Sequence, residues 1–399
     1  MNRGADMTMP GNRVKLDRIP ADIYPVIQIR CLLASGVDIS ATATELDAHR
    51  PLPDYLALRR ALRPPPRIVD TRTVARSSNP LVKLVERWFG TPWAVALIAL
   101  WRARGSQAII ATGEDIGLKL ALLTRIVRGR TPIILTCHNI ATRRPAFYLG
   151  RLKVGSAVAR FQCLSRAQAD ILAGRYGIGH GRIQVIYWHV DHDFFRPDPA
   201  VPLKDQICSA GTASRDYATL IEATRDIEVD VKIAADSAWF PQALNISHDT
   251  LPQRVEARSY GTYEALRRLY AESLFVVVPL YDVPFSAGYT VILEAMAMGK
   301  AVVVSRIAQR DDFVVDGWNG FYVTPGDVEG LRERIRYLLA HPDEARRLGA
   351  NGRAMVEERF TLADYVRRME EAVRDVAALT PNPRLTGPST AAGVGTRAP

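Results

Sequence analysis

The stretch VVVPLYDVPFSAGYTVILEAMAMGKAVVVS, residues 276–305, decides the fold. It begins with a β-branched apolar run of strand length, Val276–Tyr281. After a loop that holds Pro, Ser and Gly, the segment Tyr289–Met298 predicts a helix, which Gly299 would close in a left-handed cap. The run Ala301–Ser305 predicts a second strand. Strand, loop, helix and strand in this order indicate an α/β fold with a parallel sheet.

Polar groups around the start of the predicted helix suit a nucleotide. In such units, ligands bind beyond the carboxyl ends of the strands, where unpaired helix N–H groups suit a phosphate. Glu294 lies one turn further in, and helical side chains tilt toward the N-terminus, so its carboxylate reaches the same crevice. A carboxylate can accept hydrogen bonds from both hydroxyls of a ribose. The predicted donor-binding set here is Ser286, Ala287, Gly288, Tyr289, Thr290 and Glu294. Because no GxGxxG fingerprint is present, an ordinary buried βα unit remains the alternative.

Four segments resemble motifs of one enzyme family, in the family's order. Ser286–Ser305 resembles the donor-site motif of family 4 glycosyltransferases, E-x7-E followed by A-M-A-x-G-x-P-V-V. Val185–Pro197 is similar to their interdomain segment, Arg215–Ala223 to the first helix of their C-terminal domain, and Asp316–Asp327 to their DGxNGxLVxPGD turn. The resemblance implies the GT-B fold, two Rossmann-like parallel-sheet domains that face an interdomain cleft, with a C-terminal helix that crosses back. It also implies retaining transfer from a nucleotide sugar without a metal ion or another cofactor.

Three departures from the family pattern fall in the expected donor site. Ser286 replaces the first motif Glu, which in the family contacts the donor sugar. Thr212 replaces a diphosphate-binding Arg, and Arg215 is the nearest cation that can bind phosphate in its place; a solvent-facing Arg at a helix start is the alternative. We therefore include Gly211, Thr212 and Arg215 in the diphosphate site. His189 replaces a family Gly, so the chain looks like a divergent branch.

His138 in the first domain and Glu294 in the second are the two candidate catalytic residues. It follows the apolar strand Pro132–Cys137, and family members often carry a His there that contacts the donor sugar or its phosphate. A structural His bonded to a loop carbonyl is the alternative. Asn139 shares the position. Glu114 and Asp115 end another predicted strand and either serve the acceptor hydroxyl or are solvated loop acids.

Two histidine-containing patterns imitate metal sites. Asp191–Asp193 reads Asp-His-Asp, like the DxD metal motif of the other main glycosyltransferase fold, but it lies in the interdomain segment. His189 and His192 form HxxH without a nearby Cys or His that completes a zinc set. No metal site is expected.

The net charge of +10 is concentrated in the first half of the chain. Residues 50–160 hold 20 Lys and Arg against five Asp and Glu. Within them, Leu81–Arg104 combines three Trp with basic ends and predicts contact with an anionic membrane surface. An ordinary buried helix whose Arg side chains extend to solvent is the alternative. Nucleic acid is not expected, because no recognition motif is present.

The length of 399 residues exceeds what one core normally fills. We expect a flexible N-terminus (1–20), an acceptor-side domain (21–200), a nucleotide-sugar domain (201–379) and a disordered tail (380–399). Four separated cysteines, no signal peptide and no spanning apolar run favour the cytoplasm, with peripheral attachment to the inner face of the membrane.

The predicted function is sugar transfer from a nucleotide sugar to a glycan or lipid-linked acceptor in bacterial-type polysaccharide or glycoconjugate assembly. A sugar epimerase or a phosphorylase of the same fold is one alternative, although no Lys stands out as a pyridoxal carrier. A non-catalytic subunit that binds sugar nucleotides is the other, and Ser286 and Thr212 favour it.

Overall fold

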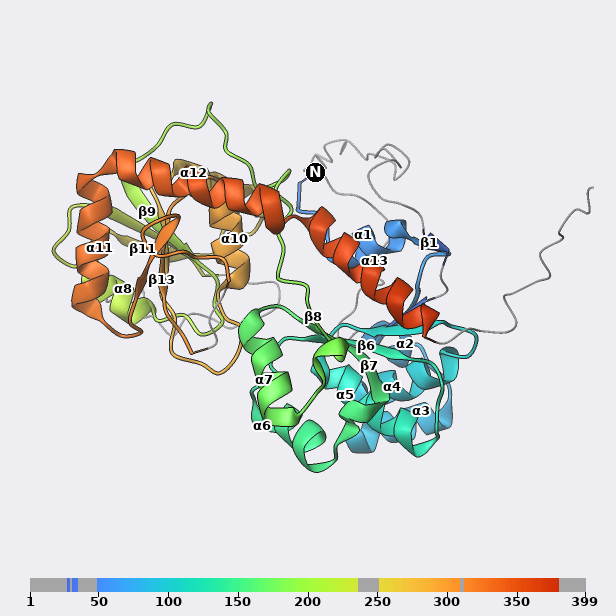
Figure 1. The fold of residues 1–399 in the computed structure, drawn as a ribbon. Helices are drawn as coiled ribbons and strands as arrows, with labels where there is room; N and C mark the ends of the chain where they lie inside the picture. Colours follow the sequence, from blue (N-terminus) through green and yellow to red (C-terminus); the bar gives the residue numbers. More distant parts are fainter. Residues whose placement is uncertain (1–26, 29–30, 35–48, 236–250, 309–311, 380–399) are drawn as a thin grey trace, which may run out of the picture.

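The computed structural model describes residues 27–28, 31–34, 49–235, 251–308 and 312–379 (Figure 1). The termini predicted to be flexible or disordered, 1–20 and 380–399, lie outside these residues. The described chain forms two six-stranded parallel sheets, each covered by helices, and a short two-stranded parallel sheet that pairs Ile27–Gln28 with Leu62–Arg63. This confirms the predicted α/β architecture.

The first sheet has the strand order β4-β2-β5-β6-β7-β8, and all its neighbours pair in parallel. Its central strands are almost wholly apolar because both faces of the sheet are covered. The elements of this half are β1 (Ile27–Gln28), β2 (Cys31–Ala34), α1 (Asp54–Ala61), β3 (Leu62–Arg63), β4 (Arg67–Val69), α2 (Thr71–Ala75), α3 (Pro80–Phe89), α4 (Thr91–Arg102), β5 (Ala108–Ala111), α5 (Glu114–Ile126), β6 (Ile133–Cys137), α6 (Arg143–Ala146), the π-helical turn η3 (Phe147–Arg151), the 3-10 turn η4 (Val154–Ala157), β7 (Val158–Cys163), α7 (Arg166–Tyr176), the 3-10 turn η5 (His180–Arg182) and β8 (Ile183–Val185).

The second sheet has the order β11-β10-β9-β12-β13-β14, again parallel throughout. Read in chain order, this is the 3-2-1-4-5-6 arrangement of dinucleotide-binding folds. The elements of this half are β9 (Gln206–Ala210), α8 (Tyr217–Thr224), β10 (Asp230–Ala234), β11 (Val255–Arg258), α9 (Tyr263–Glu272), β12 (Val276–Val278), α10 (Tyr289–Ala297), β13 (Val302–Ser305), β14 (Gly320–Val323), α11 (Val328–Ala340), α12 (Pro342–Arg359) and α13 (Leu362–Ala378).

The strand–helix–strand unit predicted around α10 is confirmed. Gly299 has φ +68°, and the N–H of Lys300 bonds the carbonyl of Ala295 at 2.9 Å, which closes the helix in a Schellman cap. A side chain at residue 299 would be strained at this positive φ, so glycine is needed there.

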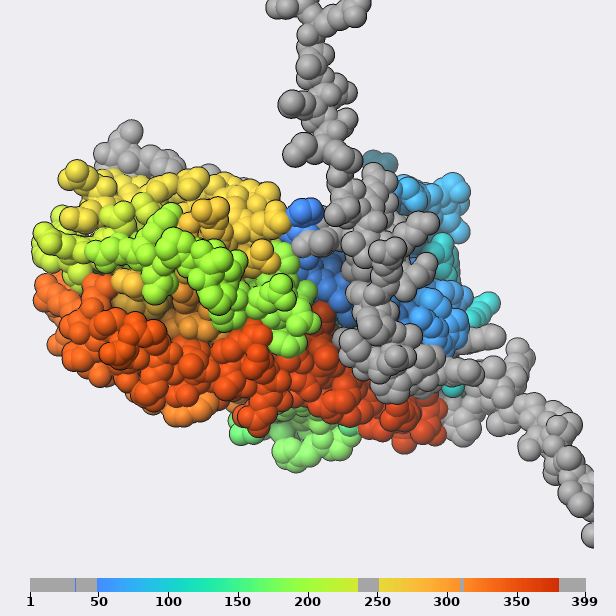
Figure 2. Space-filling model, turned by 90° about the horizontal axis from the view of Figure 1, so that it is seen from above, coloured from blue at the N-terminus to red at the C-terminus, as the bar shows by residue number. Residues whose placement is uncertain are grey.

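The C-terminal helix crosses back to the first domain. α12 lies on the second domain, and α13 packs against α1 and against β5, β6 and β7 of the first sheet. Figure 2 shows this pair as one continuous band of orange and red atoms along both domains. At the crossing, Val190 and Thr361 form a parallel bridge, so two chain segments connect the domains side by side.

Leu81–Arg104 is two helices, which differs from the single stretch considered above. Gly90, at φ +86°, interrupts the helix and separates α3 from α4. α4 buries five of its twelve residues, Ala94, Val95, Ala96, Ile98 and Ala99, whereas α3 buries only Val82. The buried-helix alternative fits the apolar face of α4, although Trp101 at its end is exposed, and the interfacial prediction fits α3 better.

Candidate active site at the domain junction

The predicted donor-binding segments meet at one point of the second sheet. β9 and β12 are neighbours there, and the strand order reverses between them. The turn Gly211–Arg215 follows β9, and the loop that ends at Gly288 follows β12. Ligands of parallel α/β sheets bind in the crevice at such a reversal. The topology therefore brings together two loops that the sequence separates.

The start of α10 has a backbone conformation that requires glycine. Gly288 has φ +82°, and a Cβ there would lie 3.1 Å from Val278 Cγ1 and 3.2 Å from Leu280 Cδ1. Ala287 and Tyr289 are buried, whereas Thr290 is exposed. N–H groups in the first turn of a helix have no partner within the helix, and the helix dipole favours an anion there. A helix start of this kind suits a phosphate, and the diphosphate site stays a prediction.

Glu294 is buried beneath this helix start. Its Oε2 accepts a hydrogen bond of 2.9 Å from the hydroxyl of Tyr270 in α9. Burial raises the pKa of Glu294 to about 7, although the Tyr270 bond and the positive charge of Arg215 act in the opposite direction. The carboxyl group therefore changes its charge near neutral pH.

Arg215 holds the turn after β9 in shape. Its Nε donates to the carbonyl of Ala210 and its Nη1 to that of Ala213, both at 2.8 Å. Gly211 has φ +91°, and a Cβ there would lie 2.7 Å from Nη2 of Arg215. Arg215 is therefore not the solvent-facing arginine of the alternative reading. Its Nη2 lies on the Gly211 side of the turn, and Thr212 is half-buried in the same turn.

His138 follows β6 and is half-buried. Its Nε2 lies 2.8 Å from the carbonyl oxygen of Thr112, which can only accept a hydrogen bond, so Nε2 carries a proton. In the neutral ring Nδ1 is then an acceptor. The ring also meets the edge of Trp188, with 5.8 Å between centroids. The bond to a loop carbonyl expected of a structural histidine is present, and it leaves Nδ1 for a ligand.

Glu114 shapes the turn that carries His138. Its Oε1 accepts from the backbone N–H groups of His138 and Asn139, both at 2.7 Å. Burial raises the pKa of the Glu114 carboxyl, and these interactions oppose the rise. Glu114 is therefore not a solvated acid. Asp115 and Asn139 are exposed.

Two residues that the sequence analysis missed bond to the loop before α10 and to its first turn. Gln168 of α7 donates from Nε2 to Ser286 Oγ at 2.8 Å. Trp188, in the interdomain segment, donates from Nε1 to Thr290 Oγ1 at 3.0 Å. A signal for Gln168 was present, because it stands three residues after the helix-capping Ser165, the position of the capping-box Gln.

The patterns that imitate metal sites have structural roles. Asp191 Oδ1 accepts from the N–H groups of Asp193 and Phe194, and its Oδ2 from that of Leu52. The ring of His189, which is half-buried, lies against Tyr365 of α13, with centroids 4.2 Å apart. Across the described residues, no group of three His, Cys, Asp or Glu could hold a metal ion.

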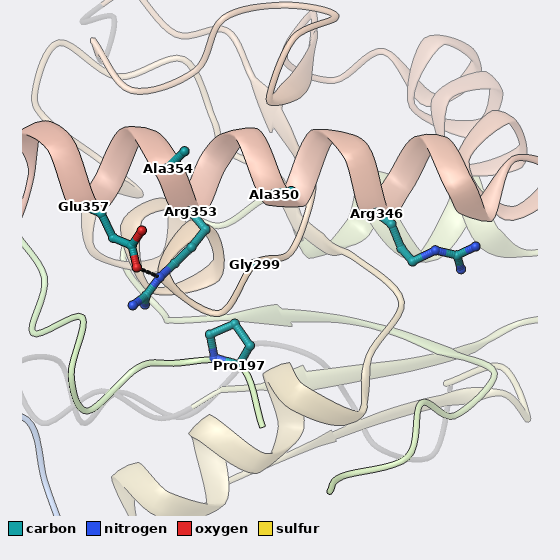
Figure 3. A pocket seen from close by; sticks show the side chains of 7 residues that line it. All are labelled: Pro197, Gly299, Arg346, Ala350, Arg353, Ala354 and Glu357. Atoms are coloured by element: carbon teal, nitrogen blue, oxygen red, sulfur yellow. Dashed lines mark hydrogen bonds and ion pairs between the residues drawn. The ribbon is translucent and has the colours of Figure 1, made fainter. Parts of the chain in front are cut away.

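A hollow between Gly299 and α12 lies at the opposite end of α10 (Figure 3). Arg353, which lines it, donates from Nη1 to the carbonyls of His192, Phe195 and Ala297 and forms an ion pair with Glu357. Its guanidinium thus ties the interdomain segment to α10. We interpret the hollow as part of the domain junction.

Comparisons with known proteins identify glycosyltransferases as relatives of this chain. Residues 39–194 match the family described as Glycosyltransferase Family 4, and residues 214–341 match Glycosyl transferases group 1. The chain is 25% identical over 289 residues to alpha-maltose-1-phosphate synthase of Mycolicibacterium smegmatis, covering 62% of this chain and 74% of that one. It is 25% identical over 356 residues to the MMP alpha-(1->4)-mannosyltransferase of Mycolicibacterium hassiacum, covering 79% and 84%.

Among solved structures, the Anabaena protein HepE in complex with UDP superposes with a TM-score of 0.64 at 17% identity, covering 87% of this chain and all of that one. The likeness confirms the predicted GT-B fold. In the part of the chain that the structure describes, no helix is long and apolar enough to cross a bilayer.

Proposed function

Because this chain belongs to the family 4-like glycosyltransferases of the GT-B fold, we propose that it moves a sugar, with retention, from a nucleoside diphosphate sugar to a glycan or lipid-linked acceptor. The observation that carries the proposal is the meeting of the Gly211–Arg215 turn and the α10 start at the switch point of the second sheet. His138 lies beside them, because Gln168 bonds both its carbonyl and Ser286.

The donor would bind the second domain through its two polar parts. The diphosphate would lie at the start of α10, where N–H groups and Arg215 Nη2 stabilise its negative charge. The ribose hydroxyls would bond to Glu294, whose ionised form accepts two hydrogen bonds. UDP is the nucleotide in the HepE structure, and it is the first candidate to test here.

His138 would contact the transferred sugar. Its neutral ring offers an acceptor at Nδ1, which matches a sugar hydroxyl better than a phosphate oxygen, because the latter also only accepts. In the reaction, the bond between the anomeric carbon and the diphosphate oxygen breaks. The acceptor hydroxyl oxygen bonds to that carbon, and its proton passes to the released diphosphate. The dipoles at the α10 start would stabilise this leaving group.

The acceptor would approach from the basic first domain. α3 carries an exposed apolar face there, with Leu81 47%, Leu84 53% and Trp88 73% exposed at i, i+3 and i+7. Arg87 on the same helix is also exposed. This combination favours an anionic membrane surface and a lipid-linked acceptor on the cytoplasmic face. Cys137, Cys163 and Cys208 are free and buried, in keeping with a reducing compartment.

A donor panel separates this function from its rivals. Thermal shift with UDP-, GDP- and ADP-sugars would identify the donor, since a ligand of the folded state raises the melting temperature. The selected donor is then incubated with and without a lipid extract. A transferase releases nucleoside diphosphate faster with the extract. An epimerase changes the sugar without the extract, and a non-catalytic binding subunit shows the thermal shift alone; either result would contradict the proposal.

A further inference from the structure

The side-chain amide of Gln168 links the two domains inside the candidate active site. Gln168 is fully buried. Its Oε1 accepts from the N–H of Leu164 at 2.7 Å, and its Nε2 donates to the carbonyl of His138 at 3.1 Å and to Ser286 Oγ at 2.8 Å. The neighbouring N–H and carbonyl fix which end of the amide is the donor. The two N–H groups of Nε2 are both used in these bonds. Because one of them goes to Ser286, the orientation of the Ser286 hydroxyl depends on a residue of the first domain.

These bonds determine what Ser286 and Thr290 can offer a ligand. Gln168 donates to the Ser286 oxygen, and Trp188 donates to the Thr290 oxygen. In each case, the hydroxyl hydrogen remains to be donated elsewhere, and a hydroxyl that accepts a hydrogen bond is polarised as a donor. Both hydroxyls flank Gly288, at the helix start that suits a phosphate. Diphosphate oxygens only accept, so they are matched to these hydroxyl groups.

We propose that Gln168 and Trp188 are positioning residues that hold the Ser286 and Thr290 hydroxyls as hydrogen-bond donors to the diphosphate of the donor nucleotide. This rests on the proposed function and names the groups that connect the domains to nucleotide binding. Because Gln168 lies on the first domain and Ser286 on the second, the orientation of the Ser286 hydroxyl depends on the contact between the domains.

A double-mutant cycle tests this arrangement. UDP, GDP and ADP affinities are measured by titration calorimetry for the wild type, Gln168→Met, Ser286→Ala and the double variant. Each single change should weaken binding of the preferred diphosphate by about tenfold. The double variant should bind about as well as the single variant with the lower affinity, because the two substitutions remove the same interaction. Additive losses, or wild-type affinity in Gln168→Met, would overturn the inference.

The cycle needs a control for the loss of a buried amide. Gln162 is also fully buried, and its side chain bonds Thr136 and Gln184 within the first sheet. Gln162→Met should lower the melting temperature yet leave nucleotide affinity unchanged; an equal loss of affinity would reduce Gln168 to a stability role. If Gln168→Met does not fold, Trp188→Phe, which keeps one aromatic ring and deletes the N–H, takes its place in a cycle with Thr290→Val.

The outcome also separates this inference from the proposed function. Wild-type protein that binds none of the three nucleotides would contradict the donor site itself. Wild-type protein that binds one of them, with Gln168→Met and Trp188→Phe equal to it, would leave the donor site standing and contradict the positioning role alone.

Discussion

Glu294 and Tyr270 form a hydrogen bond of 2.9 Å between two helices that cover the same sheet, with both side chains buried. The bond places a carboxylate under the α10 start while its other oxygen, Oε1, has no hydrogen-bond partner among the described residues. Burial of this pair has consequences for both stability and ligand binding.

The first prediction concerns stability and pH. Because burial raises the pKa of Glu294 to about 7, the folded protein binds a proton more tightly than the unfolded chain. This contribution is complete at acidic pH and is lost as the pH rises through about 7. Glu294→Gln should therefore raise the free energy of unfolding by about 3 kcal/mol at pH 8 and by less than about 1 kcal/mol at pH 5. Urea denaturation at both pH values measures this. Exposed Glu333→Gln gives the surface baseline, and a gain that is equal at both pH values would contradict the titration of Glu294.

The second prediction concerns nucleotide affinity. Glu294→Gln should weaken binding of the preferred nucleoside diphosphate by about tenfold, because a bond to a charged group contributes about 1.5–3 kcal/mol. Tyr270→Phe is the companion variant, since it removes the bond at Oε2 and leaves the carboxylate. Calorimetry at pH 8 compares the two. Unchanged affinity in Glu294→Gln would exclude its contact with the ribose.

The third prediction concerns the helix start. Gly288→Ala introduces a Cβ at φ +82°, with contacts of 3.1 and 3.2 Å to Val278 and Leu280. We expect a loss of about 1–2 kcal/mol in unfolding free energy and weaker diphosphate binding, because the first-turn N–H groups shift. Gly181→Ala is the matched control, since no atom lies within 4 Å of its Cβ. Wild-type affinity in Gly288→Ala would separate the diphosphate from this helix start.

The sequence was sufficient for features that are set locally. The helix Tyr289–Met298 was predicted to within one residue of α10, and the cap at Gly299 was correct, because both depend on neighbouring residues. The N-cap at Ser165 was likewise found from its own helix. Apolar strands bounded by turns indicated the parallel sheets for the same reason.

Contacts between distant segments could not be predicted. Gln168 and Ser286 are 118 residues apart, and nothing in either segment indicates that the other will lie beside it. Glu294 is buried by tertiary packing and bonds Tyr270 of another helix, so its raised pKa could not be predicted from its own segment either. The break at Gly90 was missed because the apolar pattern continues on both sides of it, although a single glycine can end a helix.

The fourth prediction concerns metal ions. Transferase activity should survive EDTA, because Asp191 uses its carboxylate to accept three backbone N–H groups. Initial rates with and without chelator measure this, with magnesium and manganese added back in parallel. Loss of activity that either metal restores would return Asp191 and Asp193 to the role of metal ligands.

The last prediction concerns the exposed face of α3. The protein should bind vesicles that contain anionic lipid and ignore neutral ones, because each basic residue near such a surface contributes about 1 kcal/mol, screened over about 8 Å at physiological salt. Leu84 and Trp88 are 53% and 73% exposed. Replacing both by Ala should reduce the vesicle binding that remains at high salt, without a change in melting temperature. Trp318→Ala is the control, since Trp318 is exposed on the second domain. Co-sedimentation at low and high salt gives the result. Equal binding of the double variant and the wild type would remove α3 from the membrane contact, and binding to neither kind of vesicle would favour a water-soluble glycan as the acceptor.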